Sequence, residues 1–161
     1  MKIGIISDSH DHFENIKKAV RIFRDKGVGY VVHLGDFVNP GSIKFFEGIK
    51  LKAVFGNNDG DKYRLMNSFG EIGGEINGDF YEFEEDGLKF ACYHGTELQL
   101  KDALIQSGIY DVVMYGHTHQ CENKKAGDTL ALNPGTAHGF WKDATIMIFD
   151  TKNKEVEIIN L

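Results

Sequence analysis

The chain has 161 residues, 42% of them hydrophobic, and a formal net charge of −6. This length and composition suit one folded domain with a real core, so residues 1–161 are predicted to form a single domain. No apolar stretch approaches the roughly 20 residues of a membrane-spanning helix, so no membrane partner is expected. The lysines and arginines are scattered, which argues against nucleic-acid binding through a basic patch.

The cysteines indicate a reducing environment. Cys92 and Cys121 are the only two, and they form no CxxC pair. A disulfide framework and a zinc ribbon are therefore not expected, and a cytoplasmic location is predicted. Cys92 is predicted to be a small core residue and Cys121 a loop residue. Asp8 follows the first apolar run too soon for a secretory signal.

Short apolar runs recur along the chain and predict β-strands, because they are brief, often β-branched and flanked by Gly, Asp or Asn. The predicted strands are Ile3–Ile6, Tyr30–Leu34, Ala53–Phe55, Leu88–Tyr93, Val112–Tyr115 and Thr145–Phe149.

Two helices are predicted between these strands. The first rests on the three- and four-residue spacing of Phe13, Ile16, Val20 and Phe23. Asp11 with Glu14 predicts a capping box at its start, and Lys26-Gly27 predicts its end. The second helix is predicted to begin at Thr96, with Gln99 three residues on, and to end near Ser107-Gly108.

The order of the elements predicts an α/β fold with mixed sheets. The first half follows the pattern strand–helix–strand–helix–strand, which favours a parallel sheet with right-handed crossovers. Asp86-Gly87 predicts a hairpin between Phe80–Glu84 and Leu88–Tyr93, and Thr151–Lys154 separates two further strand candidates. A two-sheet sandwich with helices outside accommodates both halves of the chain.

Polar residues follow five of the apolar runs, and functional groups in open α/β sheets gather beyond the carboxyl ends of the strands. Carboxylate, imidazole and amide groups without a thiolate suit Mn²⁺, Fe²⁺, Co²⁺, Ni²⁺ or catalytic Zn²⁺. The candidate metal ligands are Asp8, His10, Asp36, Asn57, His94, His117 and His119.

These candidate ligands are too many for one zinc-like centre and suit two ions. Two divalent ions bring four positive charges and the two aspartates two negative ones, which leaves about +2 at the site. The ions would thereby give a mildly acidic protein the positive charge that it needs to bind an anionic phosphate ester. Two ions roughly 3.5–4 Å apart can share one oxygen nucleophile and clamp a phosphoryl group.

The motifs resemble, in their order, those of the calcineurin-like metallophosphoesterases. They are Asp8-x-His10, Gly35-Asp36, Gly56-Asn57-x-Asp59, His94-Gly95 and Gly116-His117-Thr118-His119. The short chain and the late stretch Asn133-Pro134-Gly135-Thr136 resemble the small, YfcE-type phosphodiesterase branch, and the resemblance runs from Ile3 to about Phe149.

This resemblance implies a four-layer α/β/β/α sandwich and a dinuclear metal centre, with Mn²⁺ the expected ion. It also implies a small phosphoester substrate and leaves open a homodimer or a higher homo-oligomer. By the same resemblance, Asp36 would bridge the ions and position a metal-bridging hydroxide. One ion would be held by Asp8, His10, Asp36 and His119, and the other by Asp36, Asn57, His94 and His117.

The chain departs from many members of the family at Asn58. Those members carry a His there, which is thought to protonate the leaving oxygen. A neutral amide cannot act as a general acid, and the loss of one typically costs about 10²–10⁴-fold in rate. Poor turnover of esters with basic leaving groups is therefore expected, with better turnover of activated diesters.

Other interpretations stay open at this stage. A protein-binding scaffold like the retromer scaffold subunit has a similar fold with fewer metal ligands. A phosphomonoesterase or a nuclease could use the same metal site. Among the remaining histidines, His33 is predicted to be packed or to support a ligand, and His12 and His138 to lie at the surface or at a pocket rim. The aromatic residues Phe45, Phe46, Phe80, Tyr81 and Phe83 are predicted to be core or an oligomer interface.

Overall fold

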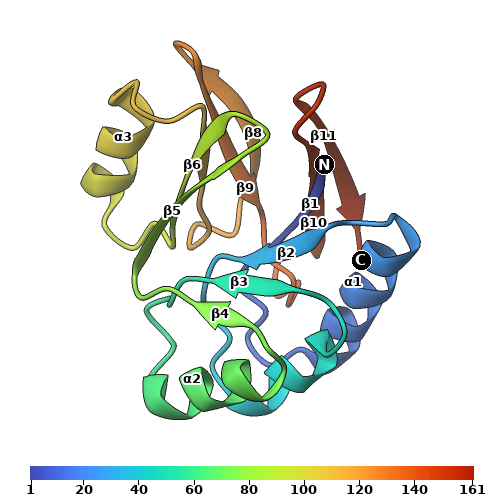
Figure 1. Ribbon diagram of the computed structural model, residues 1–161. Helices are drawn as coiled ribbons and strands as arrows, with labels where there is room; N and C mark the ends of the chain where they lie inside the picture. Colours follow the sequence, from blue (N-terminus) through green and yellow to red (C-terminus); the bar gives the residue numbers. More distant parts are fainter.

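The computed structural model describes all residues from 1 to 161 and contains two β-sheets packed face to face (Figure 1). The first sheet has the strand order β11 (Glu155–Asn160), β10 (Thr145–Asp150), β1 (Lys2–Ile6), β2 (Tyr30–His33), β3 (Leu51–Ala53) and β4 (Glu75–Ile76). The second sheet has the order β5 (Phe80–Glu85), β6 (Leu88–Tyr93), β7 (Val112–Met114), β9 (Thr129–Pro134) and β8 (Cys121–Ala126).

Both sheets are mixed, as predicted. In the first sheet β1, β2, β3 and β4 run parallel, while β10 pairs antiparallel with β1 and β11. In the second sheet β6, β7 and β9 run parallel, with antiparallel β5 and β8 at the edges. The predicted hairpins at Asp86-Gly87 and Thr151–Lys154 join β5 to β6 and β10 to β11.

Helices cover the outer faces of the two sheets (Figure 1). The first sheet is covered by α1 (Phe13–Asp25), the 3₁₀ helix η1 (Pro40–Phe46) and α2 (Lys62–Glu71), and α3 (Leu98–Gln106) lies beside the second sheet. Side chains alternate along a strand, so Ile3 and Ile5 of β1 pack between the sheets whereas Ile6 packs under the helices. The resulting order of layers is the predicted α/β/β/α.

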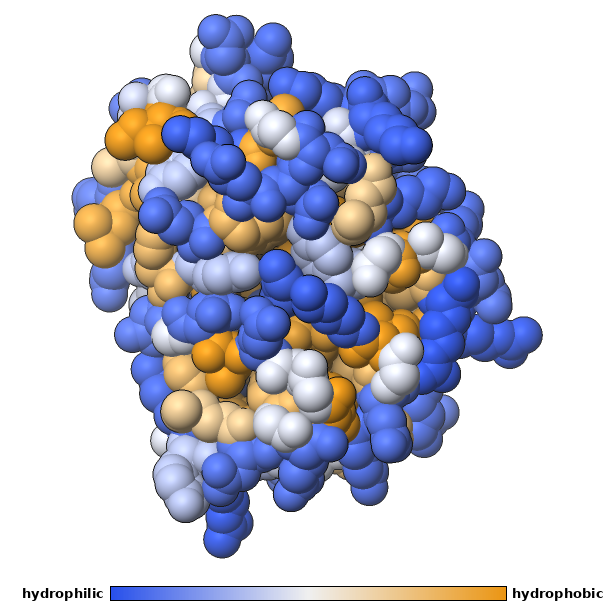
Figure 2. Space-filling view, in the orientation of Figure 1, coloured by the Kyte–Doolittle hydropathy of each residue, from blue (hydrophilic) through white to orange (hydrophobic).

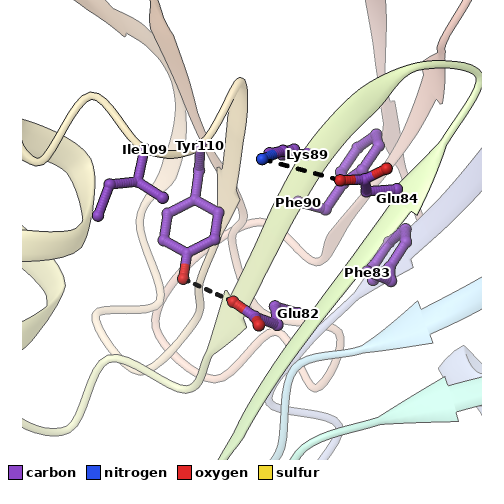
Figure 3. Close-up of a pocket in the computed structure, with 7 residues that line it drawn as sticks. All are labelled: Glu82, Phe83, Glu84, Lys89, Phe90, Ile109 and Tyr110. Carbon is purple, nitrogen blue, oxygen red and sulfur yellow. Dashed lines mark hydrogen bonds and ion pairs between the residues drawn. The ribbon is translucent and has the colours of Figure 1, made fainter.

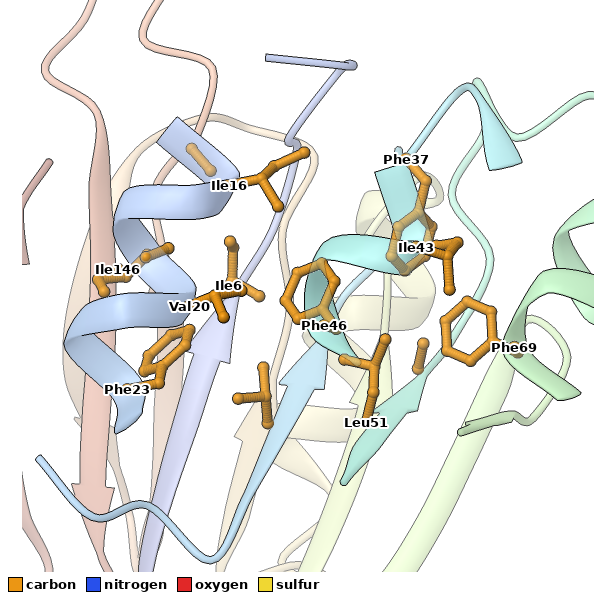
Figure 4. Packing of buried hydrophobic residues seen from close by; sticks show 14 of the residues in the cluster. Ile6, Ile16, Val20, Phe23, Phe37, Ile43, Phe46, Leu51, Phe69 and Ile146 are labelled. Carbon is orange, nitrogen blue, oxygen red and sulfur yellow. The ribbon is translucent and has the colours of Figure 1, made fainter. Parts of the chain in front are cut away.

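The contact between α1 and β1 is close because of a glycine. A Cβ on Gly4 would lie 2.7 Å from Cδ1 of Phe23, so only a residue without a side chain lets this ring reach the strand. Figure 4 shows Phe23 and Val20 of α1 packed beside Ile6, with Phe46 of η1 filling the space toward Leu51. This packing fixes the helix layer on the sheet and holds the end of β1 in place.

Several local predictions are wrong in detail. The N-cap of α1 is His12, whose Nδ1 accepts a hydrogen bond from the Asn15 N–H, and not Asp11. Asp11 turns away and accepts from the Asn39 N–H, because it lies in the strained loop after β1. The second predicted helix, α3, begins at Leu98 without a side-chain cap, so Thr96 does not start it.

Some elements lack a sequence signal. The second crossover is the 3₁₀ helix η1 and not an α-helix, since Pro40 and Gly41 shorten it. Cys121 begins strand β8, so its assignment to a loop is wrong, whereas Cys92 is fully buried in the core as predicted. The unpredicted elements are α2, β4, β8 and β9.

Apolar side chains also reach the surface around α3. Leu98 and Leu100 are about half exposed, and Ile109 in the following loop is more exposed still. Figure 2 shows this apolar area at the upper left, over α3. The predicted aromatic group is mostly packed inside, with Phe46 fully buried and Tyr81 and Phe83 against the core between the sheets. No helix is long and apolar enough to cross a membrane.

His33, at the end of β2, is fully buried. Its ring stacks on Phe37 at 3.6 Å, its Nδ1 accepts from the Gly35 N–H, and its Nε2 lies 3.0 Å from Ser9 Oγ. The predicted packing role is confirmed. Burial lowers the pKa of His33 to about 3, so the ring stays neutral in the folded protein.

This neutral ring makes stability depend on pH. Below about pH 6.5 the unfolded chain binds a proton at His33 that the folded protein does not, so stability falls as the pH drops toward the folded pKa of about 3. Between about pH 7 and about pH 5, we expect the free energy of unfolding to fall less in His33→Gln than in the wild-type protein. The difference between the two slopes should be on the order of 1 kcal/mol per pH unit. Urea unfolding of both metal-free proteins measures this, and equal slopes would contradict it.

Candidate metal centre

The seven predicted ligands come from five loops that follow strands of both sheets. Asp8 and His10 follow β1, Asp36 follows β2, and Asn57 follows β3. His94 follows β6, and His117 and His119 follow β7. All five strands are parallel members of their sheets, so their carboxyl ends lie at one edge of the sandwich. The structure brings all seven side chains together there.

The first group gathers around Asp8. Its Oδ1 lies 3.1 Å from Nε2 of His119 and 3.9 Å from Nε2 of His10. His10 Nε2 also lies 3.4 Å from Oδ2 of Asp36. One ligand atom each from Asp8, His10 and Asp36 lies within 4.8 Å of the others, a spacing that one cation can span.

The second group gathers around Asn57. Its Oδ1 lies 3.0 Å from Nε2 of His94 and 2.8 Å from Nδ1 of His117. His94 Nε2 is in turn 3.5 Å from Oδ2 of Asp36. The same Asp36 oxygen therefore lies near His10 of the first group and near His94 of the second.

Two atoms of the first group are orphaned. Asp8 Oδ1 and His10 Nε2 are buried and have no hydrogen-bond partner. Unpartnered buried polar groups cost free energy, so an acceptor and a ring nitrogen that face one another without a bond suit a shared cation. The donor set, two carboxylates, four imidazoles and an amide oxygen, fits a pair of first-row divalent ions.

The tautomer of His94 also suits metal binding. Its Nδ1 lies 2.7 Å from the carbonyl oxygen of Leu34, which can only accept a hydrogen bond. Nδ1 therefore carries a proton, and Nε2 is the nitrogen that faces the Asp36 and Asn57 oxygens and that a cation shared with them would bind. Such a backbone partner is the usual way in which proteins orient a ligating imidazole.

The electrostatics of the site keep both carboxylates ionised. Burial opposes ionisation of Asp8 and Asp36, but neighbouring groups outweigh it and lower both pKa values. The neighbours are mainly His10 and His119 for Asp8, and His94 for Asp36. In return, the Asp8 carboxylate raises the pKa of His10. The pKa of His94 is raised as well, because Asp36 outweighs the opposing effect of burial.

Backbone strain is concentrated at the predicted ligands. Residues other than glycine rarely adopt positive φ, and the cost is about 1–3 kcal/mol each. Five of the seven predicted ligands adopt it: Asp8 (51°), His10 (38°), Asp36 (59°), His117 (65°) and His119 (55°). Strain of this kind persists where the surroundings enforce it, and it is characteristic of functional sites.

Two glycines allow the loops to approach this closely. A Cβ on Gly56 would lie 2.2 Å from Asp36 Oδ1, and one on Gly116 would lie 2.0 Å from Ser7 Oγ and 2.7 Å from Asp8 Oδ2. Each glycine therefore provides the space that a buried carboxylate occupies. The glycines of the Gly56-Asn57 and Gly116-His117 pairs therefore have a steric role.

Asp59 holds the strained loop after β2 and was not singled out by the sequence analysis. Its Oδ1 accepts from the N–H groups of Phe37 and Val38, at 2.7 and 2.9 Å. Its Oδ2 accepts from the N–H groups of Asp36 and Gly56, at 3.0 and 2.7 Å. Four backbone donors converge on one buried carboxylate, which joins the Asp36 loop to the Asn57 loop. Its place in the Gly-Asn-x-Asp motif was the available signal.

Asn58 lies beside Asp36 and is exposed. Its backbone N–H donates to Asp36 Oδ1 and its side-chain amide donates to Asp36 Oδ2, both at 2.8 Å. The residue at the position of the family's general acid is therefore a neutral donor next to the predicted bridging ligand.

Side chains of the stretch Asn133–Thr136 donate hydrogen bonds to the loops that carry the predicted ligands. Asn133 Nδ2 donates to the carbonyl of Gly116 and to Thr118 Oγ1, which steadies the loop of His117 and His119. Thr136 Oγ1 donates to the carbonyl of Asp8. The stretch is therefore more than a turn, because its side chains hold the loops that carry the predicted ligands.

His138, predicted to lie at the surface or at a pocket rim, is buried beside two of the predicted ligands. It is 5% exposed, and its ring lies 4.7 Å from that of His10 and 4.9 Å from that of His119. Burial, with His10 next in effect, lowers the pKa of His138 to about 4. No strand-end signal marks it in the sequence, because it enters the site from the loop after β9. His12, the other histidine placed at the surface, caps α1.

Another hollow lies on the outer face of the second sheet, beside the β5–β6 hairpin (Figure 3). Tyr110 donates to Glu82 across it, and Lys89 pairs with Glu84 at 3.8 Å. It contains none of the predicted ligands and no convergent ring nitrogens. The candidate metal centre is therefore the better functional site.

The chain is similar to known proteins in sequence and in fold. A family model described as the calcineurin-like phosphoesterase superfamily domain matches residues 1–154. The chain is 45% identical over 165 aligned positions to Phosphodiesterase MJ0936 of Methanocaldococcus jannaschii, covering 100% of this chain and 99% of that one. A solved structure described as a novel archaeal phosphodiesterase matches with a TM-score of 0.95, at 44% identity and with both chains fully covered.

More distant structures share the fold alone. YfcE, a phosphoesterase from E. coli, matches with a TM-score of 0.73 at 18% identity, covering 99% of this chain and 98% of that one. A Vps29 variant from Entamoeba histolytica matches with a TM-score of 0.71 at 16% identity, covering 100% and 99%. At such identities the likeness identifies the sandwich and leaves the chemistry to the site residues.

The clamp made by Asp59 can be tested by Asp59→Asn. The variant keeps the size but replaces one acceptor oxygen by an NH₂ group that faces backbone N–H groups. We expect a loss of about 2–4 kcal/mol in the free energy of unfolding, measured by urea denaturation of the metal-free protein. Asp128→Asn, at a fully exposed position, is the matched control and should change little. An unchanged stability of Asp59→Asn would contradict the clamp.

Proposed function

This chain belongs to the calcineurin-like phosphoesterase superfamily, and we propose that it is a metal-dependent phosphodiesterase acting on small phosphate esters. The observation that supports this proposal most strongly is the place of Asp36 Oδ2, between His10 of one ligand group and His94 of the other. A single carboxylate oxygen in that position suits two ions that share a ligand. The 45% identical phosphodiesterase supports the diester specificity.

We propose that the site holds two divalent ions, with Mn²⁺ the expected pair. Asp8, His10, Asp36 and His119 would hold one ion, and Asp36, Asn57, His94 and His117 the other. When bound, the ions supply an activated water and positive charge at the phosphoryl group. The chain itself contributes the buried negative charge of Asp8 and Asp36, which retains the ions, and strained loops that hold the ligands in position.

The protein offers no nucleophile of its own at the site. Burial raises the pKa of the Cys92 thiol to about 12 and places it in the core, so it forms no thiolate there. Ser7 donates a hydrogen bond to Asp8 Oδ2, a carboxylate whose lowered pKa makes it a weak base. Water is therefore the proposed attacking group: its oxygen forms a bond to phosphorus and gives up a proton, and the bond to the leaving oxygen breaks. That proton ends on the leaving oxygen or, where the leaving group is stable as an anion, in the solvent.

The protonation of the leaving oxygen is the weak point of this site. Asn58 provides an amide N–H, which can donate a hydrogen bond but not a proton. Leaving groups that depart as stable anions need no proton, so activated diesters suit the site better than alkyl esters. The absence of a general acid beside Asp36 thus limits the range of substrates and not the ability to hydrolyse.

The alternatives from the sequence are less well supported by the site. A metal-poor scaffold would not need seven converging ligands or the strain that five of them carry. A nuclease would need a basic surface, and the chain is acidic, with a net charge of −6. A phosphomonoesterase that acts on alkyl monoesters would need a general acid for the leaving oxygen, which Asn58 cannot provide.

A cytoplasmic location remains part of the proposal. Cys92 and Cys121 are both free, as expected in a reducing compartment.

The bridging role of Asp36 is tested by Asp36→Asn. An amide carries no charge and offers one acceptor oxygen in place of two, so we expect Mn²⁺ per chain to fall from two to one or none by elemental analysis. Hydrolysis of bis(nitrophenyl) phosphate should fall by about 10³-fold or more. Asp128→Asn serves as the control. Two bound ions with full activity in Asp36→Asn would disprove the assignment.

The diester preference is tested with two substrates that share a leaving group. With Mn²⁺ bound, we expect kcat/KM for bis(nitrophenyl) phosphate to exceed that for mono(nitrophenyl) phosphate by about tenfold or more, and a methyl nitrophenyl diester to lose nitrophenol and not methanol. The first expectation rests on the 45% identical phosphodiesterase, and the second on the lack of a proton donor at Asn58. A higher rate for the monoester would favour a phosphomonoesterase.

A further inference from the structure

His138 is a buried group at the candidate metal centre to which the proposed function gives no role. Its backbone N–H donates to the carbonyl of Asp8 at 3.2 Å, which ties its loop directly to a ligand loop. Its ring stands nearly perpendicular to the rings of His10 and His119, at 87° and 78°. Ring nitrogens of these three histidines lie within 4.8 Å of one another. A histidine in this place is either an additional ligand or a donor to the substrate.

The hydrogen bond at Nδ1 decides between these roles. The Phe140 N–H donates to His138 Nδ1 at 2.9 Å, and an N–H can only donate. Nδ1 must therefore carry a lone pair, so the proton of the neutral ring is on Nε2. An Nε2 that carries a proton cannot ligate a metal ion. It makes no hydrogen bond within the protein, so it has a proton available for a ligand.

His94 has the opposite arrangement, with its Nδ1 facing the Leu34 carbonyl oxygen. That partner accepts, so His94 has its lone pair on Nε2 and suits a metal ion. The two histidines of one site are thus set to opposite tautomers by the backbone groups behind them. The contrast assigns a ligand role to one ring and a donor role to the other.

The chain around His138 is shaped to keep this tautomer. Gly139 has φ +78°, a conformation that favours glycine, and the turn it makes brings the Phe140 N–H back to the ring of His138. The Phe140 ring packs on His138 with the ring centroids 4.8 Å apart. The imidazole is therefore held on several sides, and its orientation is fixed before any ligand arrives.

We infer that His138 Nε2–H donates a hydrogen bond to a non-bridging phosphoryl oxygen of the substrate, on the side of the site formed by His10 and His119. This inference rests on the proposed function. The ring is neutral, and transfer of its only proton would leave an imidazolate, so His138 does not replace the missing general acid. Its effect is to orient the phosphoryl group and to stabilise the negative charge on its oxygens.

The test uses His138→Phe, which keeps a ring for packing but has no donor, and His138→Gln, whose amide can donate from a similar position. In Mn²⁺-loaded protein we expect the dissociation constant of inorganic phosphate, measured by calorimetry, to rise about tenfold or more for His138→Phe and less for His138→Gln. Metal content should stay at the wild-type value in both variants. Hydrolysis of bis(nitrophenyl) phosphate should fall in the same order.

A spectroscopic readout is independent of metal and of activity. In ¹⁵N spectra of the metal-free protein, His138 should show a protonated Nε2 and His94 a protonated Nδ1, assigned by comparison with the two variants and with His94→Gln. A protonated Nδ1 on His138 would overturn the inference whatever the activity.

The remaining outcomes separate the inference from the function on which it rests. Loss of metal in His138→Phe would make His138 a ligand, and unchanged phosphate affinity would reduce it to a packing residue. Either result overturns the inference and leaves the phosphodiesterase proposal intact. A wild-type protein that binds no divalent metal would instead disprove the proposed function.

Discussion

The burial of two carboxylates at one edge of the sandwich is the constraint on which the rest of the site depends. Asp8 and Asp36 are 0% and 1% exposed, and an ionised carboxylate in an apolar environment is very costly unless it is paired. Backbone and side-chain groups that donate hydrogen bonds to the two carboxylates offset part of this cost, and imidazole rings face the remaining carboxylate oxygens. The oxygen of Asp8 that keeps no hydrogen-bond partner marks the place where the protein alone does not complete the pairing.

The strained loops follow from the same constraint. Each carboxylate leaves a central strand and must turn at once toward the other sheet, which forces positive φ at Asp8 and Asp36. The core supplies the stability against which such strain is held, with one apolar cluster between the sheets and another under α1, η1 and α2. The Asp59 carboxylate then holds the Asp36 loop through four backbone N–H groups.

The sequence predicted the central strands and the seven converging side chains because both leave regular signals. Buried parallel strands are short apolar runs, and site residues follow their carboxyl ends. The edge strand β8 is largely polar, and α2 has only Leu65 and Phe69 buried, so neither shows a strong pattern. His138 was placed at a surface or pocket rim because its position depends on the turn at Gly139, a feature of the tertiary structure. The tautomer of His94 depends on the distant Leu34 carbonyl and that of His138 on the turn at Gly139, so neither could be read from the sequence.

The contacts that position the site loops explain how the same fold can occur with or without a catalytic site. The Asp59 clamp, the two close-approach glycines and the Asn133 contacts fix the loops through protein groups alone, so the ligands are in position before a metal ion binds. A relative that lost ligand side chains but kept these supports would keep the same sandwich, and for that reason likeness of fold to Vps29 carries no argument about chemistry. The chemistry depends on what the scaffold carries, which here is seven converging candidate ligands and a histidine whose Nε2 makes no hydrogen bond within the protein.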